Sequence, residues 1–209
     1  MVFQNFLYCN GTGSLAPISG SYYTTGTRGS ALTDIINIHA YEGSSGTPER
    51  LAKDVPAFTA VLSAKDFAKP FWSGGGGWGP DTSPPPQFGE GETTDCLNNQ
   101  AAFMDRYYLV GWSTKVLGYD WYGYSSTCCG TLWNSSGGLN LAGIDWGTAY
   151  KWVVGSTLTT PCSASGTVWT CELTLANGTA AEAIWDTSQI CSDGTCTTSN
   201  QNVSTIWTN

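Results

Sequence analysis

The sequence predicts an α/β protein in which a parallel sheet with its helices is followed by a small antiparallel β region. Two observations indicate the first part: short apolar, β-branched runs recur along the chain, and segments of helical spacing separate them. A third indicates the second part: after Gly155 the residues Thr, Val, Trp and Cys alternate, with a turn at 176–179. We therefore expect one region over 1–155 and a C-terminal β appendage over 156–209.

Three apolar segments are expected to form the parallel strands. They cover residues 34–41, 69–73 and 116–124, and the second runs directly into the glycines at 74–77. Their content of Ile, Val, Phe and Trp is typical of strands that are buried on both faces. Because helical segments separate them, the strands are expected to run parallel, with the helices packed outside the sheet.

Three further segments are expected to be helices. The first begins near Thr47, which can cap a helix, and Pro48 suits its first turn. Its apolar residues keep helical spacing along one face, at Leu51, Val55, Phe58, Val61 and Leu62. The second covers about 98–115 and the third 142–154, whereas 80–95 is rich in Pro and Gly and is expected to be a surface loop.

Charge and hydropathy exclude two classes of partner. The 209 residues carry a formal net charge of -8, and the eight Lys and Arg are scattered singly. Since phosphate binding depends on clustered basic side chains, nucleic acid is not expected as a partner. No apolar run approaches the roughly 18 residues that cross a bilayer, so no membrane partner is expected.

The aromatic content points toward carbohydrate. Ten Trp and ten Tyr exceed what a core of this size requires, and charged residues make up only 11% of the chain. Sugars present C–H faces that pack on aromatic rings, and their hydroxyls need neutral donors and acceptors. The alternative is that the Trp residues fill a large aromatic core.

The eight Cys indicate disulfides in an oxidising compartment. Zinc would require closely spaced Cys pairs or several His, and the chain has one His, so no metal or cofactor is expected. Two pairs are close enough to staple hairpins: Cys162 with Cys171, and Cys191 with Cys196. We expect a secreted, extracellular protein whose leader was either removed or not included in this sequence. Four sequons are compatible with this: Asn10, Asn134, Asn177 and Asn202.

In parallel α/β architectures the functional residues gather at the carboxyl ends of the strands. The candidate binding residues at these ends are His39, Tyr41, Trp72, Trp78, Tyr119 and Trp121. An imidazole, several indoles and phenols on one rim are suited to stacking on a sugar and hydrogen-bonding it. The alternative is that these rings fill the interior and that His39 is a hydrogen-bonded core residue.

Several motifs keep a common order along the chain. They are DIINIHAY at 34–41, KPFWS at 69–73 with WG at 78–79, QAAFMDRYYL at 100–109, WY at 121–122 before GTLW at 130–133, and VWTC at 168–171 before AIWDT at 183–187. Together they resemble the C-terminal half of a secreted (β/α)8-barrel glycoside hydrolase, in the clan of retaining enzymes that includes families 39 and 5. The resemblance covers roughly residues 30–190.

The resemblance implies a partial (β/α)8 (TIM-type) barrel, with strands six to eight and their helices, followed by the β appendage. In the family, the His and Tyr after strand six line the sugar site, which carries over to His39 and Tyr41. In the family, a Trp of strand eight forms the floor of the sugar subsite, and the resemblance assigns this role to Trp121. Strand seven of the family ends in Thr-Glu, whose Glu is the nucleophile, and the matching positions here are Gly74 and Gly75.

The second carboxyl group of the family is missing as well. Its acid/base Glu ends strand four, and residues 1–33 contain no Glu. Retaining hydrolysis needs two carboxyl groups about 5–5.5 Å apart. We therefore expect no catalytic residue, and a degenerate or truncated glycoside hydrolase-like protein that binds polysaccharide or oligosaccharide without hydrolysing it.

Two alternatives remain open. The first is an active glycosidase that uses other carboxylates, Glu42 and Asp120. By strand alternation, however, Asp120 is expected to face away from Trp121. The second is an extracellular, disulfide-bonded structural protein that self-associates through open sheet edges.

Overall fold

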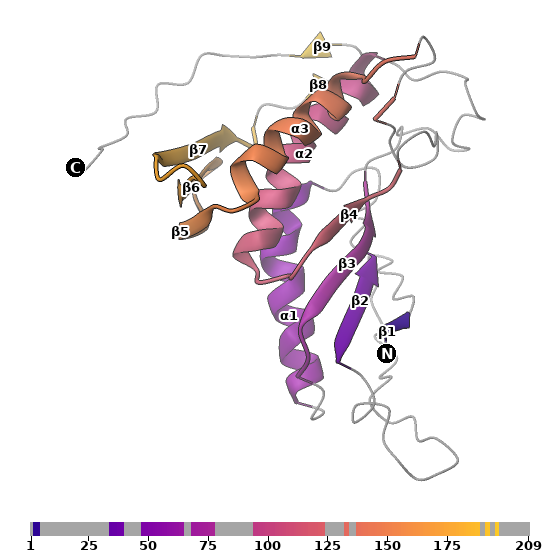
Figure 1. Ribbon diagram of the computed structural model, residues 1–209, viewed down its shortest axis with the longest axis vertical. Helices are drawn as coiled ribbons and strands as arrows, with labels where there is room; N and C mark the ends of the chain where they lie inside the picture. Colours follow the sequence, from indigo (N-terminus) through magenta and orange to yellow (C-terminus); the bar gives the residue numbers. More distant parts are fainter. Residues whose placement is uncertain are drawn as a thin grey trace.

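The computed structural model describes residues 2–4, 34–39, 47–64, 68–77, 94–123, 132–133, 137–188, 191–192 and 195–196. These residues form a mixed α/β arrangement of small sheets and three α-helices (Figure 1). The α/β part comprises β1 (Val2–Gln4), β2 (Ile35–His39), η3 (Pro48–Arg50), α1 (Leu51–Ser63), β3 (Phe71–Gly76), α2 (Thr94–Ser113), β4 (Tyr119–Trp121) and α3 (Leu141–Val153). It is followed by β5 (Thr157–Ser165), β6 (Val168–Thr174), β7 (Ala180–Asp186), β8 (Cys191–Ser192) and β9 (Thr195–Cys196).

The first four strands form one parallel sheet in the order β1-β2-β3-β4. The helices α1, α2 and α3 lie to one side of this sheet (Figure 1). The α/β class predicted from the sequence is therefore confirmed. The partial barrel is not confirmed, because the four described strands form an open sheet, and a barrel closes only when about eight tilted strands meet edge to edge.

The strand predictions are correct in place and differ in length. Strand β3 includes three of the glycines, so the predicted strand continues to Gly76. Strand β4 has only three residues, fewer than the predicted 116–124. Backbone bonds to β3 nevertheless extend beyond it, from Leu117 N to Phe71 O at 2.8 Å and from Tyr122 N to Gly76 O at 2.7 Å.

The three predicted helices are confirmed, with shifted ends. Helix α2 begins at Thr94, before the predicted 98, and Lys115 with a φ of 63° follows its end. The Thr47 side chain makes no capping bond, and its backbone oxygen instead accepts from Arg50 N at 3.1 Å. At α3 the cap is a side chain, because Asn140 Oδ1 accepts from Gly143 N at 2.9 Å.

The main core lies between the parallel sheet and helices α1 and α2. Its buried members are Ile36, Leu51, Val55, Phe71, Phe103, Tyr107, Val110 and Val116. A second cluster joins α2 to α3 through Met104, Ala142 and Ala149. Helix α2 therefore contributes to both, and it holds the sheet and α3 together.

The predicted antiparallel region is also confirmed. Strands β5, β6 and β7 form an antiparallel sheet, and the turn between β6 and β7 falls at the predicted 176–179. The predicted disulfide between Cys162 and Cys171 joins β5 to β6. In the pair β8–β9 the register places Cys191 opposite Cys196, and a bond between them stays a prediction.

The antiparallel sheet packs directly on α2. Buried Cys171 and Leu173 contact Leu109 of the helix, and Cys162 N donates to Ser113 Oγ at 2.8 Å. The predicted boundary at 155 falls at the turn after α3, and the division into two domains stays a prediction. Among the described residues, none of the helices combines the length and the apolar character that a membrane crossing requires.

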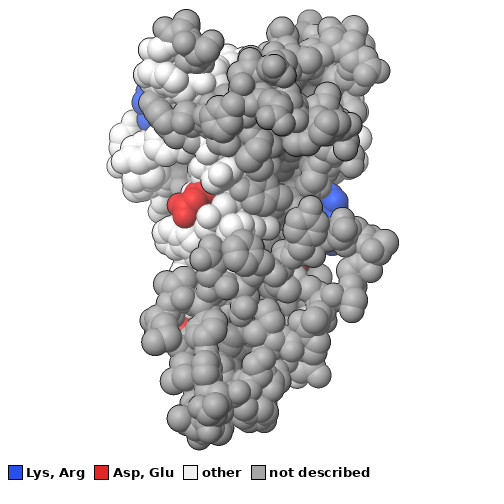
Figure 2. All heavy atoms as spheres, turned by 90° about the vertical axis from the view of Figure 1, so that its right-hand side faces the viewer, with Lys and Arg blue, Asp and Glu red and all other residues white. Residues whose placement is uncertain are grey.

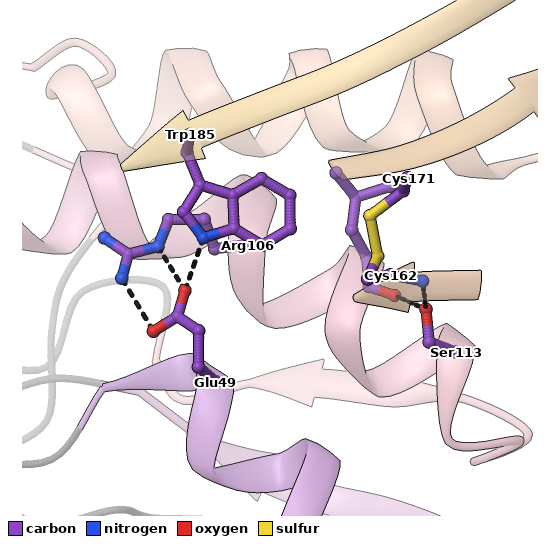
Figure 3. The surroundings of a disulfide bond; sticks show 7 residues. Glu49, Arg106, Ser113, Cys162, Cys171 and Trp185 are labelled. Atoms are coloured by element: carbon purple, nitrogen blue, oxygen red, sulfur yellow. Dashed lines mark hydrogen bonds and ion pairs between the residues drawn. A yellow bond between two sulfur atoms is a disulfide. The ribbon is translucent and has the colours of Figure 1, made fainter. Parts of the chain in front are cut away.

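A buried ion pair ties the same sheet to the α/β part (Figure 3). Arg106 Nε donates to Glu49 Oε1 at 2.6 Å and Arg106 Nη2 donates to Glu49 Oε2 at 2.7 Å. Trp185 Nε1 of β7 donates to the same Oε1 at 2.7 Å. One carboxylate thus connects η3, α2 and β7.

Candidate functional site

The face of the parallel sheet opposite the helices carries an exposed indole. Along β3, Phe71 and Ser73 are buried toward the helices, whereas Trp72 between them is 39% exposed. On β4, Tyr119 and Trp121 contact α2, so Asp120 lies on the same face as Trp72. Figure 2 views the molecule from the right-hand side of Figure 1, where an acidic patch and isolated basic side chains are visible among the described residues.

The ring of Trp72 is fixed in position by its neighbours on β4. Its Nε1 donates to Asp120 Oδ2 at 3.0 Å. The far edge of the ring lies over Gly118, where an added Cβ would be 2.6 Å from Trp72 Cη2. A glycine is therefore required at 118 for the indole to lie across the neighbouring strand. The result is an aromatic surface whose position is held from both ends.

Next to Trp72 the same face has a buried polar floor. Asn37 of β2 is almost fully buried, and its Oδ1 accepts from Gly74 N at 2.7 Å. An added Cβ at Gly74 would lie 2.4 Å from this oxygen. A glycine is thus needed at 74 because a larger residue would overlap the Asn37 side chain.

The strand ends meet at one edge, as the sequence predicted. In the register of the sheet His39 pairs with Gly75, and Gly76 pairs with Trp121. Gly75, the position to which the resemblance assigns the nucleophile, therefore lies near the end of a parallel strand and pairs with His39. The predicted residues Tyr41 and Trp78 lie outside the described residues.

The side chains at this edge do not all converge. Tyr119 and Trp121 pack on Tyr107 of α2, with ring centroids 5.0 Å and 5.9 Å apart. Burial raises the pKa of Tyr119, so its hydroxyl stays protonated. The expectation of a single rim is therefore wrong for these two rings, which lie on the helix side of the sheet while Trp72 lies on the other. Their role in binding stays a prediction.

The contact between β3 and α2 explains another glycine. Ser73 Oγ and Tyr107 OH lie 2.9 Å apart within hydrogen-bonding distance, and both side chains are fully buried. An added Cβ at Gly76 would lie 2.0 Å from Tyr107 OH. Gly76 lets the strand approach the helix closely, which is a structural reason for part of the glycine run.

Among the described residues, few carboxylates lie near this site. Within the strands of the parallel sheet as described, Asp120 is the only acidic residue. Glu49 is engaged by Arg106 and Trp185 away from this face. In the part of the chain that the structure describes, no group of His, Cys, Asp and Glu is arranged to hold a metal ion. Glu42, the other carboxylate that the sequence offered for an active glycosidase, lies outside the described residues.

Two carboxylates with raised pKa values lie elsewhere, between α2 and α3. Burial and the charge of Asp145 raise the pKa of Asp105 to about 6, and burial raises the pKa of Asp145. The Oδ1 atom of Asp105 is buried without a hydrogen-bond partner in the described structure. Sequence patterns gave no sign of this pair, because the two residues are forty positions apart.

This pair predicts a pH-dependent stability. Since the pKa of Asp105 is near 4 in an unfolded chain, the folded state binds its proton more tightly between pH ~4 and ~6, and stability falls as pH rises through that window. Asp105→Asn is expected to raise the free energy of unfolding at pH ~7 by about 1–2 kcal/mol after allowance for partial exposure, with little gain at pH ~4. Urea denaturation at both pH values measures this. Asp54→Asn is the control, because the Asp54 side chain on α1 is exposed. An equal gain in the free energy of unfolding of Asp105→Asn at both pH values would contradict the prediction.

No known family model matches the chain, and no curated protein matches its sequence.

Proposed function

We propose that this protein binds polysaccharide or oligosaccharide on the open face of its parallel sheet and does not hydrolyse it. The observation that carries the proposal is Trp72, an exposed indole held across Gly118 by a bond to Asp120. A ring fixed in this way presents its face to the C–H groups of a sugar at little cost in side-chain entropy. The carboxylate of Asp120 keeps further lone pairs for sugar hydroxyls.

The absence of hydrolysis is part of the proposal. Retaining enzymes place two carboxyl groups about 5–5.5 Å apart, whereas Asp120 is the single acid on the described strands of this sheet. Its Oδ2 is engaged by the indole of Trp72. Under this proposal the chain is related to glycoside hydrolases of the (β/α)8 class, with β2, β3 and β4 in the places of strands six to eight and Gly75 in that of the nucleophile. The pairing of Gly75 with His39 supports this correspondence.

An extracellular location belongs to the same proposal. The disulfide between Cys162 and Cys171 supports it, because such bonds persist mainly in oxidising compartments. Polysaccharide outside the cell is then the natural ligand class.

Replacing the indole tests the proposal. Trp72→Ala is expected to weaken binding of a soluble oligosaccharide at least about tenfold, since truncating a central aromatic residue removes a large part of a binding energy. The ligand is first chosen from a panel by depletion of the protein with insoluble polysaccharides, and the affinity is then measured by calorimetry. Trp146→Ala is the matched control, because Trp146 is also 39% exposed and its indole is also hydrogen-bonded, but it lies on α3.

Two further variants separate positioning from charge. Asp120→Ala releases the indole and is expected to weaken binding, whereas Asp120→Asn keeps an acceptor for Trp72 Nε1 and is expected to retain most of the affinity. The wild type and both Asp120 variants are expected to release no reducing sugar from a bound polysaccharide. Equal affinities for wild type and Trp72→Ala, or hydrolysis that disappears in Asp120→Asn, would contradict the proposal.

A further inference from the structure

The aromatic ring on the open face of the parallel sheet has a negative charge at its edge. Asp120 of β4 is exposed, and its Oδ2 accepts from Trp72 Nε1 at 3.0 Å. An ionised carboxylate offers about four lone-pair sites, so the bond to the indole leaves it able to accept from a further donor. The site therefore combines an exposed aromatic face with an anionic acceptor.

Within the described part of the chain, no ion pair neutralises the charge of Asp120. The ion pairs found there involve Glu49 and Asp54 instead. The lysines that lead into β3 and β4 are Lys69 and Lys115, and Lys115 precedes Asp120 by five positions. At about 3.3 Å per residue the backbones of both lysines lie more than about 10 Å from Asp120, which is the screening length at moderate salt. The carboxylate is thus open to a cation from a ligand.

The hydrogen bond to Asp120 also makes the face of the Trp72 ring more attractive to a cation. Aromatic rings carry negative charge on their faces, and Trp attracts cations more strongly than Tyr or Phe. A carboxylate that accepts from the indole N–H shifts electron density into the ring, because hydrogen-bonded groups polarise one another. Since the ring is held across Gly118, its face and the carboxylate keep a fixed relative position.

A saccharide stacked on Trp72 places its substituents beside Asp120. When a pyranose packs its C–H face on an indole, its equatorial substituents extend past the edge of the ring. The edge that carries Nε1 is the one at which Asp120 lies. An ammonium group there is attracted by the carboxylate and by the ring together, a hydroxyl group gains only a hydrogen bond, and a carboxyl group is repelled.

We propose that the site formed by Trp72 and Asp120 selects saccharides with positively charged amino groups over neutral and acidic ones. This inference rests on the proposed function and names the class of saccharide that the site takes. An exposed ion pair and an exposed cation–π contact are each modest interactions. Together they are expected to make the binding of an amino saccharide about fivefold to tenfold tighter than that of its neutral counterpart.

Three β-1,4-linked tetramers of the same length test this selectivity by calorimetry: those of glucosamine, N-acetylglucosamine and glucose. At pH ~5.5 the free amino groups are charged, since α-amino groups titrate near ~8. Wild type is expected to bind the glucosamine tetramer about fivefold to tenfold more tightly than the other two. The preference is expected to shrink at ~0.5 M salt, because salt screens interactions between exposed charges.

Asp120→Asn separates the charge from the position of the ring. The Asn side chain keeps an acceptor for Trp72 Nε1, so the affinity for the glucose tetramer is expected to stay within about twofold of wild type. The preference for the glucosamine tetramer is expected to fall at least about threefold. Asp54→Asn is the matched control, because it removes the same formal charge from exposed α1 and is expected to leave the preference unchanged.

The outcomes distinguish this inference from the proposed function. If the neutral tetramers bound as tightly as the glucosamine tetramer, selection by charge would be rejected and saccharide binding would stand. If no saccharide of the panel bound, both would be rejected. An equal loss of preference in Asp54→Asn would assign the effect to the net charge of the chain and overturn the inference. A lysine tetramer that bound as tightly as the glucosamine tetramer would overturn it too, since the site would then recognise a cationic peptide.

Discussion

Glu49→Ala is expected to lower the free energy of unfolding by about 3–5 kcal/mol, because it leaves a buried charge without its partner. Glu49 and Arg106 form a bidentate ion pair in which each side chain is only 8% exposed. Removing the carboxylate leaves the guanidinium buried without its counter-charge and leaves Trp185 Nε1 without its acceptor. Urea denaturation followed by tryptophan fluorescence measures the loss as a lower midpoint at an unchanged slope.

An exposed ion pair on the neighbouring helix provides the control. Arg50 and Asp54 are 3.4 Å apart, and their side chains are 52% and 37% exposed. Asp54→Ala is expected to cost less than about 1 kcal/mol, because water screens this pair and solvates either charge alone. If Glu49→Ala cost no more than Asp54→Ala, the buried pair would not be what ties the antiparallel sheet to η3 and α2.

The same pair has a pH signature. Burial alone would raise the pKa of Glu49, but the hydrogen bond and the charge of Arg106 outweigh it and hold the pKa below its usual value. Because the folded pKa is lowered, the contribution of Glu49 is present above the unfolded value and is lost as pH falls through the folded one. Glu49→Gln is therefore expected to reduce the loss of stability in acid relative to wild type.

Much of the fold was predictable from local patterns. Segments with a clear period, such as Leu51–Ser63 and Leu141–Val153, were placed within a few residues. The start of α2 at Thr94 was not, because the residues before 98 continue the acidic, polar character of the preceding loop. The short extent of β4 depends on how it pairs with β3 across a register shift, which a single segment does not reveal.

The sequence predicted which side chains lie near the strand ends of the sheet, but it did not predict their orientation. Strand alternation correctly placed Asp120 on the face opposite Trp121. The sequence did not show which of these two faces the helices cover. In the structure Trp121 packs on Tyr107 of α2, whereas Trp72 on the other face is exposed. The Glu49–Arg106 pair was missed because 57 residues separate its members and neither belongs to a recognisable motif.

Removing the disulfide is the second change with a large expected effect. The double substitution Cys162→Ala and Cys171→Ala is expected to lower the free energy of unfolding by about 2–3 kcal/mol, since the bond closes a short loop between residues nine positions apart. Ala is chosen because Cys171 is fully buried beside Leu109 and Leu173, where a Ser hydroxyl would lack a partner. Substitution is preferable to a reducing agent, since six other Cys are present in the chain.

Thr160→Ala controls for the loss of a single contact between the same strands, because its hydroxyl donates to Glu172 on β6 in an exposed position. It is expected to cost less than about 1 kcal/mol. A double variant as stable as Thr160→Ala would mean that the pairing of β5 with β6 does not depend on the disulfide.

The number of unfolding transitions is informative as well. The backbone N of Cys162 donates a hydrogen bond to Ser113 Oγ, and Trp185 Nε1 donates one to Glu49. The antiparallel sheet is therefore expected to unfold together with α2 in one transition. Two separate transitions in the double variant would instead make the region after 155 an independent domain that the disulfide fastens to the rest of the chain.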